Sequence, residues 1–165
     1  MTDRATQPPA PDEAVVVQIE ASSFDAATAE LRAIAALRIR GPRILTSSML
    51  SVRLNPGDAV GPALDRLLAL IEDRKVVGYY LDFTLAVLDR HLRPVLGTEL
   101  PNRRVEISSL YYDRKSRLPS KNAVDLRLDS ILRDLELPER DSEGAEANAL
   151  AAAMAYLRLK PADGG

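Results

Sequence analysis

The stretch that decides the fold is VVGYYLDFTLAVLDRHL, residues 76–92. It begins with apolar, β-branched residues that favour a short buried strand, and Gly78 follows them. Beyond the turn, Phe83, Val87 and Leu88 recur at helical spacing, which predicts a helix that buries one face. A strand that passes directly into such a helix is typical of domains in which helices pack on a sheet.

The segments on either side extend this pattern. We expect strands at 14–22, 43–54, 75–80 and 103–112, a charged loop at 113–122, and helices at 62–73, 123–137 and 144–159. The helix after residue 82 is expected to end at Pro94 and Gly97. Residues 28–40 stay open between helix and strand, because alanine and leucine favour helix whereas AIAALRIR also fits a strand. Strands come first and then alternate with helices, which predicts an α/β protein with a mixed sheet and helices on its faces.

Length and composition restrict the function. The 165 residues suffice for one domain, which we place at 14–160, between a disordered lead at 1–13 and a flexible C-terminus at 161–165. The chain has no cysteine, which excludes disulfides, thiolate nucleophiles and zinc-thiolate sites. A net charge of −2 gives no overall attraction to nucleic acid.

Apolar segments give no sign of a membrane. No signal-peptide core follows the lead, and the apolar run at 147–157 is too short to span a bilayer. We therefore expect a cytoplasmic protein without membrane contact.

Three spaced segments together resemble the DnaQ-like (DEDDh) 3′ to 5′ exonucleases of the ribonuclease H-like superfamily, the type of the DNA polymerase III epsilon subunit. They are VVVQIEAS at 15–22, the stretch at 76–92, and EGAEANALAAAMAYLRL at 143–159. In the family, these segments carry Asp-x-Glu, then Phe-Asp after a strand-to-helix turn, then His followed five residues later by Asp. The resemblance covers roughly residues 14–159. It implies a ribonuclease H-like fold with a mixed five-stranded sheet flanked by helices on both faces.

The family uses two divalent ions held by carboxylates, with the histidine as general base for the attacking water. Carried over by position, the aspartates of the family correspond here to Gln18, Thr84 and Asn148, and the histidine corresponds to Glu143. Glu20 alone keeps the group that the family uses. The resemblance therefore implies a degenerate two-metal site.

Two functions follow from this comparison. The first is a non-catalytic binding or regulatory protein, a pseudoenzyme that needs no cofactor and acts through a protein partner or as a homodimer. The alternative is a 3′ to 5′ exonuclease with a remodelled site, in which Glu20 and either Asp82 or Glu143 hold magnesium or manganese. Placing Asp82 in the position of Thr84 would turn the helix by about 200° and expose its apolar stripe, so we expect Asp82 at the helix N-terminus instead.

A third reading concerns a cluster of basic residues. Arg114, Lys115, Arg117 and Lys121 lie close together in the sequence and could contact phosphates, although such a run is usually a solvated loop. The only histidine, His91, has no neighbours that would form a catalytic triad.

Overall fold

The computed structural model describes residues 12–119 and 123–161, and these form five strands and five helices. The strands are β1 (Glu13–Ala21), β2 (Leu31–Arg40), β3 (Arg43–Arg53), β4 (Lys75–Gly78) and β5 (Arg104–Glu106). The helices are α1 (Gly61–Ile71), α2 (Leu81–Leu96), α3 (Ile107–Ser116), α4 (Leu128–Asp134) and α5 (Ala145–Leu159). Most of the predicted lead at 1–13 and C-terminus at 161–165 lies outside the described residues.

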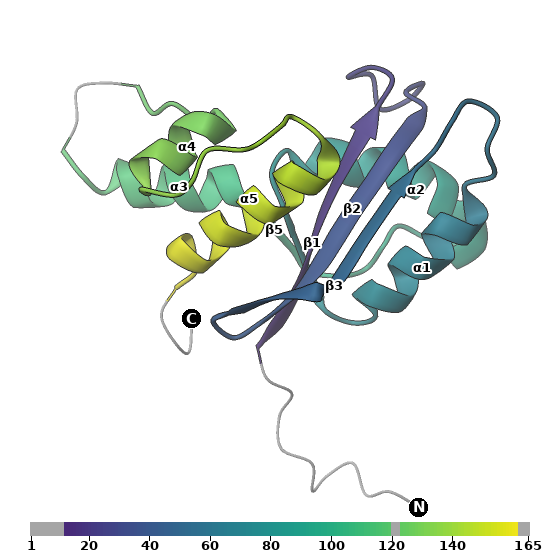
Figure 1. Cartoon of the computed structure of the whole chain (residues 1–165), viewed down its shortest axis with the longest axis horizontal. Coiled ribbons are helices and arrows are strands. Elements are labelled where there is room, and N and C mark those ends of the chain that lie inside the picture. Colours follow the sequence, from purple (N-terminus) through teal and green to yellow (C-terminus); the bar gives the residue numbers. More distant parts are fainter. Residues whose placement is uncertain (1–11, 120–122, 162–165) are drawn as a thin grey trace, which may run out of the picture.

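The five strands form one mixed sheet in the order β3-β2-β1-β4-β5 (Figure 1). β2 pairs antiparallel with β1 and β3, whereas β4 pairs parallel with β1 and β5. The register places Val16 between Leu37 of β2 and Val77 of β4. The predicted mixed five-stranded α/β sheet is confirmed.

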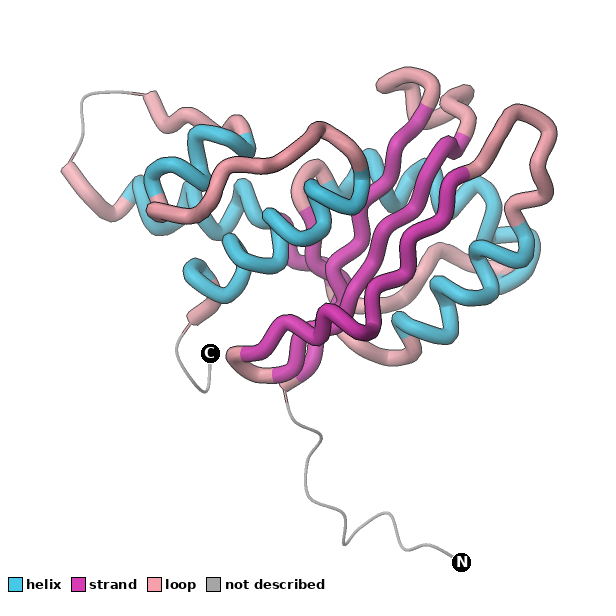
Figure 2. The backbone as a smooth tube through the Cα atoms, in the orientation of Figure 1, coloured by secondary structure: helices cyan, strands magenta, loops and turns pink. Residues whose placement is uncertain are grey.

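Helices cover both faces of the sheet (Figure 2). Alternate residues of β1 point to opposite faces: Val16 packs with α3, α4 and α5, whereas Val15 and Val17 pack with α1 and α2. A central strand buried on both sides must be apolar at nearly every position, which is why β1 reads AVVV rather than as an alternating pattern.

Residues 31–40, left open between helix and strand, form strand β2. Burial on both faces explains the ambiguity, because a strand without polar positions loses its period of two. The predicted strand at 103–112 is wrong beyond Glu106, where helix α3 begins. Tyr111 and Tyr112 therefore belong to a helix, in which the first is buried and the second is exposed.

Two further helix boundaries differ from prediction. Pro94 lies inside α2 rather than at its end, and Gly97 closes the helix in a left-handed conformation with φ 75°. Pro94 has no N–H to donate to the carbonyl oxygen of Arg90, so α2 lacks one backbone hydrogen bond in its last turn and still continues to Leu96. Helix α4 covers only Leu128–Asp134 of the range predicted as 123–137.

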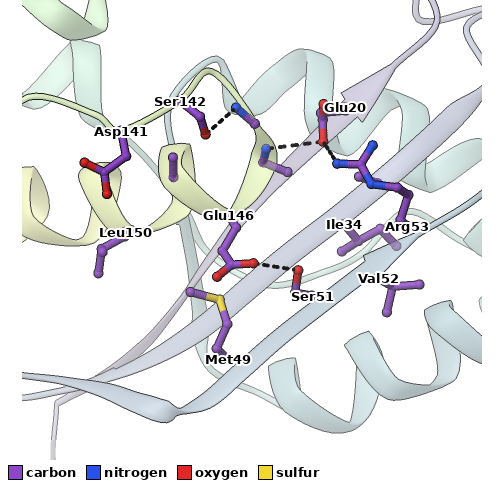
Figure 3. Close-up of a pocket in the computed structure, with 14 residues that line it drawn as sticks. Glu20, Ile34, Met49, Ser51, Val52, Arg53, Asp141, Ser142, Glu146 and Leu150 are labelled. Carbon is purple, nitrogen blue, oxygen red and sulfur yellow. Dashed lines mark hydrogen bonds and ion pairs between the residues drawn. The ribbon is translucent and has the colours of Figure 1, made fainter.

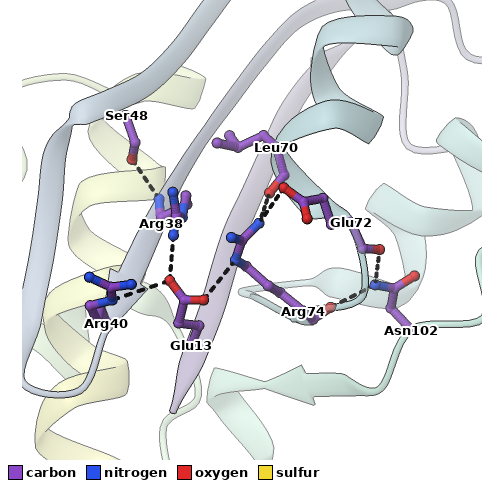
Figure 4. A network of polar contacts seen from close by, with 8 residues as sticks. All are labelled: Glu13, Arg38, Arg40, Ser48, Leu70, Glu72, Arg74 and Asn102. Atoms are coloured by element: carbon purple, nitrogen blue, oxygen red, sulfur yellow. Dashed lines mark hydrogen bonds and ion pairs between the residues drawn. The ribbon is translucent and has the colours of Figure 1, made fainter. Parts of the chain in front are cut away.

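A charged cluster fastens the amino end of β1 (Figure 4). The Glu13 carboxylate accepts hydrogen bonds from Arg38 of β2 and from Arg74 Nε at 3.3 Å, just before β4. The hydrogen bond from Arg38 is the main cause that holds the pKa of Glu13 below its usual value. This carboxylate ties three neighbouring strands together at one end of the sheet.

No helix in the part of the chain that the structure describes is long and apolar enough to cross a bilayer.

Candidate functional site

The carboxyl ends of β1, β4 and β5 meet at one edge of the sheet, because these strands run parallel. There, Gln18 Oε1 accepts a 2.7 Å hydrogen bond from the backbone N–H of Tyr79, and the Gln18 residue is only 5% exposed. Gly78 permits this close approach, since a Cβ at that position would lie 2.9 Å from the carbonyl oxygen of Val17. The amide of Gln18 is therefore used to join two strand ends.

Thr84 lies in the first turn of α2 and is 2% exposed. Its Oγ1 donates to the carbonyl oxygen of Tyr80 at 3.4 Å, one turn earlier. Tyr80 precedes the helix in the left-handed region, with φ 58°. Asp82, by contrast, has a fully exposed side chain that pairs with Arg104 at 3.9 Å. The helix thus points the threonine inward and the aspartate into solvent.

Glu106, at the end of β5, is a residue that the sequence did not single out. Its Oε1 accepts from the backbone N–H of Leu81 at 2.8 Å, and its Oε2 accepts from the backbone N–H of Ser108 at 3.0 Å. One carboxylate therefore caps the N-terminal ends of both α2 and α3, where the helix dipoles favour negative charge. An acidic residue two positions before Ser108 was the available sequence signal.

Glu20 reaches the opposite side of this edge, at the start of α5 (Figure 3). Its Oε2 accepts a long hydrogen bond from Ala145 N at 3.4 Å and lies 3.5 Å from Arg53 Nη2. It lines a pocket of about 370 Å³ between the β2–β3 surface and the first turns of α5. Glu20 is thus neutralised by an arginine and by a helix terminus.

Arg140 lies in the loop before α5 and extends its side chain to Asn148. Its Nη1 donates to Asn148 Oδ1 at 2.6 Å, and its other nitrogens hold the Asp129 carboxylate through two hydrogen bonds of 2.8 Å. The side chain is 14% exposed, and the hydrogen bonds to Asp129 raise its pKa further. Asn148 Nδ2 in turn donates to the carbonyl oxygen of Glu143 at 3.4 Å. The Glu143 residue itself is exposed.

The structure describes three of the four residues of the basic cluster. Arg114 Nη2 donates to the carbonyl oxygen of Arg158 at 2.6 Å, and Lys115 pairs with Asp134 at 3.1 Å. Both lie in α3 rather than in a loop, and Lys121 lies outside the described residues. Arg117 follows the helix directly.

These contacts limit the chemistry of the edge. Within residues 12–119 and 123–161, no three His, Cys, Asp or Glu side chains are grouped so that they could hold a metal ion. Of the five predicted positions, Glu20 and Glu143 carry carboxylates, and Glu143 is exposed. A pair of divalent ions needs several converging carboxylate oxygens, more than Glu20 alone supplies.

Comparison with known proteins is informative at the level of structure. No protein-family model matches the chain, and no curated protein sequence matches it. A solved structure of exonuclease I from Methylocaldum szegediense superposes with a TM-score of 0.72 at 13% identity, over 88% of this chain. The chain has the exonuclease I fold.

Two further solved structures agree. E. coli exonuclease I in complex with a 5cy-dT13 oligonucleotide gives a TM-score of 0.68 at 13% identity over 90% of this chain. An ExoI/SSB-Ct complex gives 0.70 at 14% identity over 91%. This chain spans only 40%, 40% and 41% of the three matched chains, respectively. The resemblance to DnaQ-like exonucleases is therefore confirmed for the fold.

Proposed function

We propose that this chain is a non-catalytic binding or regulatory protein built on the exonuclease fold. The hydrogen bond from Arg140 to Asn148 is the observation that carries the proposal. In the predicted alignment Asn148 takes the place of a metal-binding aspartate, and a guanidinium 2.6 Å from its oxygen puts a permanent positive charge there. A divalent cation at the same position would be repelled.

The other predicted positions support the same function. Gln18 and Thr84 use their polar atoms on the backbone of Tyr79 and Tyr80, so they would have to break internal hydrogen bonds to bind a ligand. Breaking a buried hydrogen bond without replacement costs about 1–3 kcal/mol. These side chains stabilise the scaffold.

The alternative is an exonuclease with a remodelled metal site. It requires Glu20 together with Asp82 or Glu143. The Asp82 side chain is turned fully into solvent toward Arg104, and Glu143 is exposed beside the site. Neither carboxylate is grouped with Glu20 and a third ligand in the described residues. We therefore rank this alternative second.

The ligand class is also part of the proposal. The basic side chains of Arg114 and Lys115 are engaged in contacts within the chain. This favours a protein partner or a second copy of the chain as the ligand. The oligonucleotide bound by the E. coli exonuclease I makes nucleic acid a further candidate. Binding through phosphates would weaken steeply as salt is raised.

Calorimetric titration with magnesium chloride and with manganese chloride tests whether the chain binds a divalent metal ion. We expect no saturable binding in the millimolar range, with the same result for Glu20→Ala. Glu30→Ala is the control, because Glu30 is an exposed glutamate that pairs with Arg32 on the surface. Saturable binding that is lost in Glu20→Ala and kept in Glu30→Ala would show that the metal site is functional.

A further inference from the structure

The outward face of α5 carries apolar residues. Ala147, Leu150 and Met154 follow one another at the spacing of a helical stripe, and the buried Ala151 lies between them on the same face. A helix that covers a sheet normally carries polar residues on that side. Leu150 is nevertheless 38% exposed, and Met154 is partly exposed. We call these three residues the α5 stripe.

Hollows lie on both sides of the α5 stripe. The pocket of about 370 Å³ extends from Leu150 across Ala33 and Met49 of the sheet (Figure 3). A second pocket, of about 210 Å³, is lined by Pro138 and Met154. Both pockets share Ala147 and Leu150 as lining residues. Leu150 is therefore a ridge between two depressions that have both apolar and polar lining residues.

The rim of these pockets is acidic. Four carboxylates line them, those of Glu20, Glu139, Asp141 and Glu146, against two guanidinium groups. Arg53 pairs with Glu20 and Arg140 holds Asp129, and these two pairs leave Glu139, Asp141 and Glu146 as the remaining carboxylates of the rim. The net negative charge repels a phosphate backbone and attracts a basic partner.

We propose that the α5 stripe binds an amphipathic helix of a partner protein, with lysine or arginine residues flanking its apolar face. Helices pack by placing the ridge of one into the groove of the other, and the Leu150 ridge between two hollows offers both features. Apolar side chains three or four residues apart on the partner would enter the two pockets. The basic flanks would face Glu139, Asp141 and Glu146. This inference rests on the proposed binding function and names its partner.

Fluorescence anisotropy with a labelled helical peptide tests the inference. The probe is an amphipathic peptide with leucine at positions i, i+3, i+4 and i+7 of each repeat and lysine elsewhere. A second probe carries glutamate in place of lysine. We expect the lysine probe to bind and the glutamate probe not to bind, and we expect the affinity to fall as salt is raised.

Leu150→Lys and Leu126→Lys are matched variants, because both leucines are 38% exposed and only Leu150 lines the pockets. Leu150→Lys should weaken binding of the lysine probe by at least about tenfold, as expected for a central apolar contact. Leu126→Lys should leave the binding unchanged. Circular dichroism of both variants confirms that each is folded.

Three outcomes would overturn the inference. The lysine probe does not bind, or it binds Leu150→Lys as well as Leu126→Lys. The third is a wild-type chain that sediments as a dimer and becomes a monomer in Leu150→Lys, because a second copy then covers the stripe. Metal binding in the calorimetric test would contradict the absence of a metal site but would leave this peptide result unaffected, so the two proposals fail separately.

Discussion

In the predicted alignment Gln18 stands at the position of a metal-binding aspartate, and in the structure its side chain joins two strands. Its side-chain oxygen accepts the N–H of Tyr79 at the end of the neighbouring strand, in a position almost closed to solvent. A buried polar group is stable only when it is hydrogen-bonded, and a buried charge requires a counter-charge as well. A neutral amide meets the first condition without the second, so Gln18 needs no counter-charge in this position.

At the amino end of the same strand, Glu13 predicts a pH dependence of stability. Its pKa is lowered in the folded chain, so it contributes stability above the usual glutamate pKa of about 4.3, and that contribution is lost as the pH falls through the folded value. Glu13→Gln should lower the free energy of unfolding by about 1–3 kcal/mol near neutral pH. Urea denaturation at several pH values measures the difference.

The difference between Glu13→Gln and the wild type should shrink as the pH falls below about 4. Glu30→Gln is the control, because Glu30 is largely exposed and a surface ion pair contributes about 0–1 kcal/mol. A difference that stays constant between neutral and acidic pH would mean that Glu13 acts by packing rather than by its charge.

Among the secondary-structure elements, the junction of β5, α2 and α3 depends on one carboxylate. Glu106 accepts hydrogen bonds from Leu81 N and Ser108 N, which lie in the first turns of α2 and α3. Glu106→Ala should therefore lower the free energy of unfolding by about 1–3 kcal/mol, measured by urea denaturation. Glu30→Ala should change it by less than about 1 kcal/mol. Equal effects of the two substitutions would contradict a capping role.

The sequence predicted those strands and helices that depend on residues close to one another in the chain. The strand and helix around Gly78 follow from local patterns, and the structure has β4 and α2 there. β2 was undecided, because a strand covered on both faces has no alternation. The start of α3 was missed although its cap is local, since Glu106 accepts from Ser108 N two residues later. Only the second contact of Glu106, to Leu81 N, depends on the tertiary arrangement.

For the whole molecule, the mixed sheet could be predicted, whereas the details of the site could not. The positions of Gln18, Thr84 and Asn148 were assigned by resemblance to a family, and they remain a prediction. Arg140 has no periodic signal, because it lies in the loop before α5 and meets Asn148 and Asp129 only after folding. Residues that close a site from loops depend on the packing of the entire chain.

We propose that this chain, although it has the exonuclease fold, does not cleave nucleic acid. Incubation of the wild-type chain with a 5′-labelled single-stranded oligonucleotide and magnesium or manganese tests it most directly, with Glu20→Ala and Glu30→Ala in parallel. We expect the oligonucleotide to stay intact in every reaction. Shortening from the 3′ end that depends on the metal, persists in Glu30→Ala and disappears in Glu20→Ala would contradict it.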